Sequence, residues 1–268
     1  MSRRLRCGKK PKTASTLSVR KLKALLWLHA LRTKRYFLST VSGSLTDALW
    51  MSIFLFGAYS SQGPEFARET YWALVAWAVI ANAGWMIGGW VDYLTELGLL
   101  EPLEFSGVSP VAAASGRSLV IAVPVSISSL LVLTLSYSMG IDALNVKSPG
   151  VALASLLLLW AQGTAYGAIL AATVLRTSIP AALLDIAALT YLGLLLAPLP
   201  PINHHVLALV PLLGPGYITR LAVAKGAGWT LLAPTTLSTL LLAAAALLYS
   251  RKTLEHVRGR GFKAVVFQ

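Results

Sequence analysis

Residues 71–91 read YWALVAWAVIANAGWMIGGWV and contain no charged side chain. At ~1.5 Å per residue, about 20 apolar residues in a helix cross the ~30 Å hydrocarbon core of a bilayer. The whole chain shares this character, since 56% of its 268 residues are hydrophobic, only 12% are charged, and the mean hydropathy is +0.69. Soluble domains carry about 25% charged residues. We therefore predict an all-α polytopic membrane protein of the cell (plasma) membrane.

Comparable apolar runs occur at five other places, which predicts six transmembrane helices at residues 38–59, 71–91, 119–139, 151–175, 179–197 and 231–249. Before the first run, Leu25, Leu26 and His29 recur at helical spacing among basic residues. This pattern predicts an amphipathic interfacial helix over residues 17–35, with a plain polybasic segment as the alternative. We divide the chain into a basic disordered tail (1–16), a transmembrane domain (17–250) and a basic cytoplasmic tail (251–268).

The segment 198–229, between the fifth and sixth predicted spans, is rich in proline and glycine. Its apolar stretch, residues 206–213, is too short to cross a bilayer and is bracketed by these residues. Proline and glycine break helices. We predict one or two half-helices dipping into the outer leaflet, and so a broken extracellular segment before the last span. A seventh full span is the alternative.

The basic residues gather in the two tails. Of the 23 Lys and Arg residues, 12 precede Leu38 and 5 follow Tyr249. Positive charge beside apolar spans fits anionic lipid headgroups, so we expect contact with the lipid bilayer and no nucleic-acid partner. With the N-terminus inside, the inner segments hold 19 basic residues and the outer segments hold 4. The positive-inside rule then predicts that both termini are cytoplasmic.

The predicted inner loop between the second and third spans is acidic. Residues 92–117 read DYLTELGLLEPLEFSGVSPVAAASGR, with acids at Asp92, Glu96, Glu101 and Glu104 and one base, Arg117. Acids are repelled by an anionic leaflet. We therefore expect this loop to face a protein partner, with a solvated linker as the alternative.

The order of residues in this loop resembles the first cytoplasmic loop of ABC-2 type transporter permeases, the membrane subunits of type-2 ABC exporters. That family has a Glu-x-Gly-Thr-Leu-Glu run, then a leucine, a Ser/Thr-Pro pair and a later glycine. Two residues depart from this pattern: Leu99 stands where the family usually has threonine, and Pro102 follows the second glutamate, where a helix former is usual. Glu104 also lies within the loop. The matching residues here are Glu96, Gly98, Leu100, Glu101, Leu103, Ser109, Pro110 and Gly116.

The resemblance implies a function and its partners. In that family the loop forms a coupling helix that docks on an ATP-binding cassette ATPase subunit, and two permease copies, identical or different, form the pathway. The predicted layout of amphipathic helix, six spans, broken segment and basic tail is also similar. The sequence has no Gly-x-x-x-x-Gly-Lys-Ser/Thr phosphate loop. We therefore expect a non-enzymatic transport subunit, with ATP and Mg²⁺ on the partner and no cofactor on this chain. The resemblance alone implies export as the direction of transport.

Four polar residues lie within predicted spans: Asp47, Asn82, Gln162 and Asp185. An aspartate at mid-bilayer costs about 2.5–3.5 kcal/mol on insertion scales. We interpret the four as candidates for the transport pathway or a subunit interface, although Asp185 also lies near Arg176 and the inner boundary. Small residues at helical spacing, Gly84 and Gly88 in one span and Gly163 and Gly167 in another, predict close helix packing.

We find no catalytic or metal-binding pattern in the sequence. The pair His204-His205 has no nearby carboxylate or cysteine, and no span offers a serine with a histidine base. Two readings from other classes stay open, an ion-coupled secondary transporter and an integral membrane enzyme or assembly factor.

Overall fold

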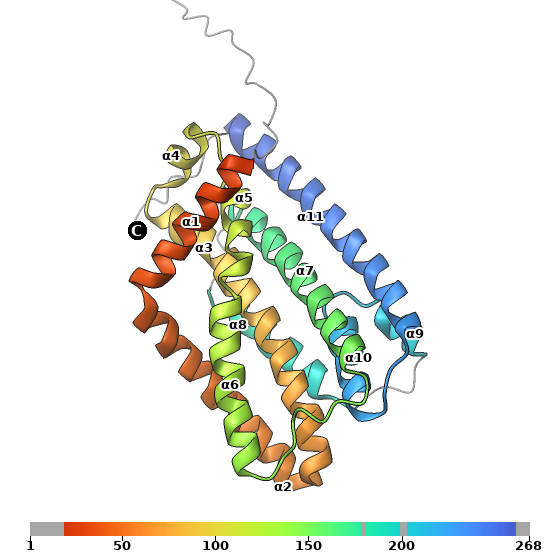
Figure 1. The fold of residues 1–268 in the computed structure, drawn as a ribbon. Helices are drawn as coiled ribbons and strands as arrows, with labels where there is room; N and C mark the ends of the chain where they lie inside the picture. The colour runs from red at the N-terminus through yellow and green to blue at the C-terminus, as the bar shows by residue number, and fades with distance from the viewer. Residues whose placement is uncertain (1–18, 178–180, 199–202, 261–268) are drawn as a thin grey trace, which may run out of the picture.

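The computed structural model describes residues 19–177, 181–198 and 203–260, so the predicted tail 1–16 and the end of the C-terminal tail lie outside it. Every regular element in the described part is a helix (Figure 1). The elements are α1 (Val19–Arg35), α2 (Phe37–Ala83), η1 (Gly84–Gly89), α3 (Trp90–Glu96), α4 (Leu100–Phe105), α5 (Pro110–Ser115), η2 (Gly116–Leu119), α6 (Ala122–Ser138), α7 (Pro149–Val174), α8 (Ala181–Leu196), α9 (His204–Ala208), α10 (Leu213–Ala224), η3 (Trp229–Leu231) and α11 (Leu232–Arg260).

Four helical stretches are long and apolar enough to cross a membrane: Phe37–Glu96, Pro110–Ser138, Pro149–Val174 and Trp229–Val257. A shorter apolar helix covers Ala182–Leu196. The prediction that the chain is all-helical is therefore confirmed for the described residues, and four of its helices are long and apolar enough to span a membrane. The count of six spans and the interfacial position of α1 stay predictions.

Helix α2 is a hairpin of two arms rather than one straight rod (Figure 1). The turn lies at Gly63, whose φ of 81° and ψ of −173° belong to a backbone region that is essentially restricted to glycine. Pro64 follows at the start of the second arm, where its fixed φ suits a first helical turn. Residues 60–70, which the predicted spans leave as a connection, are thus helical except at this turn.

The second arm of α2 continues into a π-helical turn, η1, which packs closely against α7. A Cβ atom on Gly167 would lie 2.7 Å from the Ile87 Cβ and 2.8 Å from the Ala83 carbonyl oxygen. A Cβ on Gly88 would lie 2.8 Å from the Leu170 Cβ. The glycines predicted to form packing faces therefore lie against side chains and backbone of the facing helix, and their lack of side chains lets the two backbones approach.

The segment before the last helix is broken, as predicted. Helix α9 ends at Ala208 and α10 begins at Leu213, so the break falls inside the apolar stretch 206–213. Helix α10 has 12 residues, about 18 Å at ~1.5 Å per residue, which is too short for the alternative of a seventh full span. Its Arg220 is buried and donates to the Leu195 and Ala197 carbonyl oxygens at the end of α8.

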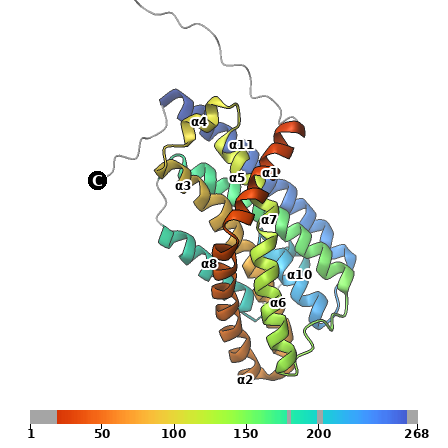
Figure 2. The ribbon, with the colours of Figure 1, turned by 60° about the vertical axis from the view of Figure 1, so that its left-hand side comes forward.

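The two ends of the bundle differ. The start of α1, the short helix α4 and the end of α11 lie at one end, and the hairpin of α2 lies at the other (Figures 1 and 2). The connection between α6 and α7 is at the hairpin end, where the Trp72 indole N–H donates to the Ala143 carbonyl oxygen over 2.8 Å. The acidic loop thus shares an end of the bundle with both termini of the described chain.

Replacing Gly63 by alanine tests the hairpin. We expect Gly63→Ala to lower the free energy of unfolding by roughly 1–3 kcal/mol, because alanine is strained at this φ and ψ. No atom lies within 4 Å of the added Cβ, so a steric clash would not contribute. Denaturant titration in detergent micelles measures the change. Gly57→Ala, in the first arm and equally uncrowded, is the control and should be neutral or stabilising. Equal effects at the two positions would contradict the hairpin geometry.

Candidate functional site

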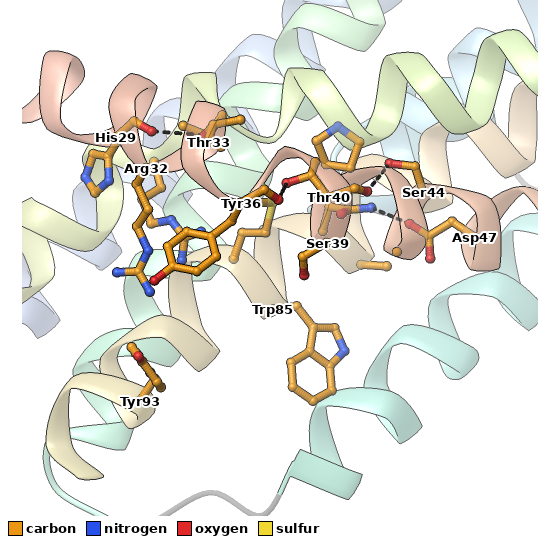
Figure 3. A pocket seen from close by; sticks show the side chains of 17 residues that line it. His29, Arg32, Thr33, Tyr36, Ser39, Thr40, Ser44, Asp47, Trp85 and Tyr93 are labelled. Atoms are coloured by element: carbon orange, nitrogen blue, oxygen red, sulfur yellow. Dashed lines mark hydrogen bonds between the residues drawn. The ribbon is translucent and has the colours of Figure 1, made fainter. Parts of the chain in front are cut away.

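A cavity of about 530 Å³ opens into the bundle beside the junction of α1 and α2. It is called the groove below. Figure 3 shows His29, Arg32 and Tyr36 near one end, Asp47 toward the other, and Thr40 and Ser44 between them. Tyr93 and Trp85 lie on the facing side. The groove is lined by His29, Arg32, Thr33, Tyr36, Ser39, Thr40, Gly43, Ser44, Asp47, Ala81, Asn82, Trp85, Met86, Tyr93, Arg117, Val120 and Pro124.

One end of the groove is cationic. The Arg32 guanidinium lies 5.3 Å from the ring centre of Tyr93 and 5.8 Å from that of Tyr36. The Arg117 guanidinium lies 5.4 Å from the ring of Trp90, which is also 6.0 Å from Arg32. Cations at such distances are attracted to an aromatic face. The rings therefore hold both guanidiniums around one point, where α1, α3 and η2 meet.

His29 fastens α1 to the acidic loop. Its Nε2 lies 3.0 Å from the Ala113 carbonyl oxygen in α5, and its ring makes an edge contact with Trp90. Burial lowers the pKa of His29 below 6.5, and the charges of Arg117 and Arg32 lower it further, although the bond to Ala113 acts in the opposite direction. Burial is the largest of these effects and favours the neutral ring, whose Nε2–H donates to the Ala113 carbonyl oxygen.

The other end of the groove brings together two of the four polar residues predicted within spans, Asp47 and Asn82. Asn82 Nδ2 donates to Asp47 Oδ2 over 3.2 Å and to the Ala78 carbonyl oxygen over 2.9 Å. This contact joins the two arms of α2. Asp185 lies outside the groove lining, but it accepts a 3.1 Å hydrogen bond from the indole N–H of Trp85, which does line the groove. Each acid thus has a neutral donor as its partner.

Gln162 has a different position from the other three polar candidates. It is fully buried and does not line the groove. Its Nε2 donates to Ser238 and Thr239 of α11, and its Oε1 accepts from the backbone N–H of Leu212. Leu212 has a φ of 66°, which is rare for a residue other than glycine. Gln162 therefore holds the bend between α9 and α10 against α7 and α11, which is a structural role.

The acidic loop 92–117 contains the end of α3, the two short helices α4 and α5, and the start of η2. Helix α4 lies between Gly98, with φ of 65°, and Gly107, with φ of 75°. Pro102 lies in the first turn of α4, where its missing N–H has no helical acceptor to lose. Ser109 caps α5 by accepting from the Ala112 N–H over 3.1 Å, and Pro110 is the first residue of that helix.

The loop has a buried side and an exposed side. Leu100 in α4 and Val111 in α5 are buried. Phe105 is 89% exposed and Leu97 is 51% exposed, beside the exposed acids Glu96 and Glu101. Leu103 and Glu104 are half-buried. An exposed phenylalanine at the end of a bundle is a surface that partners commonly cover.

Sequence reasoning found some members of these sites and missed others. It named Asp47, Asn82 and the loop residues. It missed the cluster of Arg32, Arg117, Trp90 and Tyr93 because α1 and η2 meet only in the folded chain. One signal was available, since Arg117 is the single base of an acidic loop and Arg32 ends an amphipathic pattern.

Within the described residues, no group of three or more His, Cys, Asp and Glu side chains could hold a metal ion. Comparison with known proteins found no matching family model, no matching curated protein and no matching solved structure. The groove and the loop must therefore be interpreted from their own chemistry.

Removing the Gln162 side-chain amide tests its structural role. We expect Gln162→Ala to lower the free energy of unfolding by about 1–3 kcal/mol, because the buried Leu212 N–H loses its acceptor. Denaturant titration in detergent gives the value. Gln62→Ala, at an exposed position, serves as the control and should change stability by less than about 0.5 kcal/mol. A neutral Gln162→Ala would show that the bend does not depend on this contact.

The lowered pKa of His29 predicts a pH dependence. As the pH falls below 6.5, His29 of the unfolded chain takes up a proton before His29 of the folded chain does. Stability should therefore decrease from that pH down to the folded-state pKa, and be constant with respect to this group above 6.5. Denaturant unfolding curves of the wild type and of His29→Gln, recorded at a series of pH values from 6.5 downward, measure how the free energy of unfolding of each protein depends on pH. His256→Gln, at an exposed position, should keep the wild-type dependence, and an identical slope in His29→Gln would refute the assignment.

Proposed function

We propose that this chain is the permease subunit of an ABC transporter of the type-2 class, coupled to a separate ATP-binding subunit. The observation that carries this proposal is the exposed side of helix α4, with Phe105 at its end, within a loop whose residues resemble the coupling loop of that class. The resemblance also implies export as the direction of transport.

The packing of the loop supports a coupling role. Helix α5 contacts α7, α3 and η2, and its Ala113 and Ala114 are fully buried. Helix α4, in the same loop, packs against α5. Because packed helices move as units rather than deform, a force on α4 would reach α7 and the second arm of α2 through α5. ATP-driven closure of the partner would then favour one of two arrangements of the spans.

Further expectations complete the proposal. ATP and Mg²⁺ would be held by the ATPase subunit, with no cofactor on this chain. A second permease copy, identical or related, would complete the pathway. The outer face of the first arm of α2 exposes apolar side chains that lipid or this second copy would cover: Leu45, Leu49, Trp50, Ile53 and Phe56. An ion-coupled secondary transporter and a membrane enzyme or assembly factor are the alternatives.

Copurification tests the proposal and the docking surface together. The chain, purified from its native membrane in mild detergent, is expected to carry a stoichiometric protein with a phosphate loop, identified by mass spectrometry. Phe105→Glu and Glu101→Lys should each reduce the retained partner at least about tenfold, as expected when an interface anchor is lost. Both positions are exposed, so the fold should be unaffected.

The matched control is Leu144→Glu, a similar change at a residue that is 54% exposed near the hairpin end of the bundle. It should retain the partner at the wild-type level. Reproducible purification without any ATP-binding protein, in membranes that lack ATP-dependent flux, would instead exclude the permease assignment and favour the alternatives.

A further inference from the structure

The cationic end of the groove has two positive charges and no negative one. Among the described residues, the guanidinium groups of Arg32 and Arg117 have ring contacts but no ion pair and no hydrogen bond with a protein group. Both side chains are half-buried, and both line the groove. Burial lowers the pKa of His29, which lines the same end of the groove, so this ring adds no third positive charge above pH 6.5. Two like charges in a partly desolvated space disfavour each other unless an anion lies between them.

The position of the two arginines indicates the depth of that anion. Arg32 precedes the first predicted span, which begins at Leu38, and Arg117 precedes the third, which begins at Leu119. Both therefore lie at the same boundary of the predicted hydrocarbon region, where lipid phosphates lie. The aromatic rings of Tyr93 and Trp90 restrict the guanidinium groups. Preorganised guanidinium forks bind phosphate oxygens in pairs.

The middle of the groove suits the uncharged part of a headgroup. The Ser44 hydroxyl donates to the Thr40 carbonyl oxygen over 2.8 Å, and the Thr40 hydroxyl donates to the Tyr36 carbonyl oxygen over 3.3 Å. Since each donor is used within the helix, the hydroxyl oxygens can still accept hydrogen bonds. They face the cavity and are within the same lining as Arg32. Hydroxyl groups on a ligand are the complementary donors.

We propose that the groove binds the phosphate of an anionic membrane lipid between Arg32 and Arg117, with a hydroxyl-bearing headgroup extending toward Thr40 and Ser44. A phosphatidylglycerol-type headgroup has this chemistry. The inference does not depend on the ATP-binding partner, because every residue that carries it belongs to this chain. A lipid bound there would join Arg32 of α1 to Tyr93 and Arg117, which lie at the two ends of the acidic loop.

Native mass spectrometry of the full chain tests this inference. The protein is released from mixed micelles that contain equal amounts of phosphatidylglycerol and phosphatidylcholine, and the retained lipid is counted. We expect the wild type to retain phosphatidylglycerol in preference. The Arg32→Gln/Arg117→Gln double variant should lose that preference by at least about tenfold, since two charge-assisted contacts are removed.

Two controls separate a site from general attraction to positive charge. Arg176→Gln removes a guanidinium that also lies on an aromatic ring, 5.3 Å from Tyr249, but outside the groove. It should retain the wild-type preference. Arg32→Lys/Arg117→Lys keeps both charges and should recover part of the preference, which also shows whether the double glutamine variant lost binding through misfolding.

A competition experiment identifies the source of the phosphate. If about 10-fold excess inorganic phosphate leaves phosphatidylglycerol in place, the site selects the lipid, as proposed. An excess of this size would offset a tenfold difference in affinity between the two ligands. Displacement by inorganic phosphate would support an anion site but overturn its assignment to a lipid. Equal retention of both lipids by the wild type, or an equal loss in Arg176→Gln, would overturn the site itself.

Discussion

The close approach of α7 to the second arm of α2 determines how the other helices are placed. Gly167 lies against Ile87 and Ala83 without space for a side chain, and Gly88 lies against Leu170 in the same way. Between helices in a bilayer there is little hydrophobic driving force, so tight packing of small residues must supply the association. One turn along α7, Gln162 joins α11 and the bend before α10 to this pair. Within the apolar core of the bundle, these glycine contacts and one buried amide join α2, α7, α10 and α11.

Around this centre, the acidic loop and the groove share structural parts. Helix α5 bears on α7, and it also accepts the hydrogen bond from His29 that holds α1 in place. Arg117 follows α5 directly, while Tyr93 belongs to α3 at the other end of the loop. A displacement of the loop would therefore move two walls of the groove. Occupation of the groove and docking on α4 are thus expected to influence each other, as linked equilibria must.

Hydropathy and helix-breaking residues were sufficient to predict long apolar helices and the broken segment, because both depend on local sequence. The pairing of residues that are distant in sequence was not predictable in this way. Arg32 and Arg117 meet only because α1 packs on η2. Arg220 illustrates the same limit, since charge counting placed it in an outer segment but gave no sign of its contacts. It is in fact buried, beside Glu69 at 3.7 Å, with its donors on the end of α8.

The π-helical turn at Gly84–Gly89 sets the directions in which the side chains of α3 point around the helix axis. A wide turn inserts about one residue into a helix, and one residue corresponds to about 100° of rotation around the axis. The side chains of α3 are therefore rotated by that amount relative to a continuous α-helix. Tyr93 lies beside Arg32 in this rotated frame. A conversion of η1 to regular α-helix would rotate α3 about its own axis and move Tyr93 away from the Arg32 guanidinium. No helix would have to unfold for this to happen.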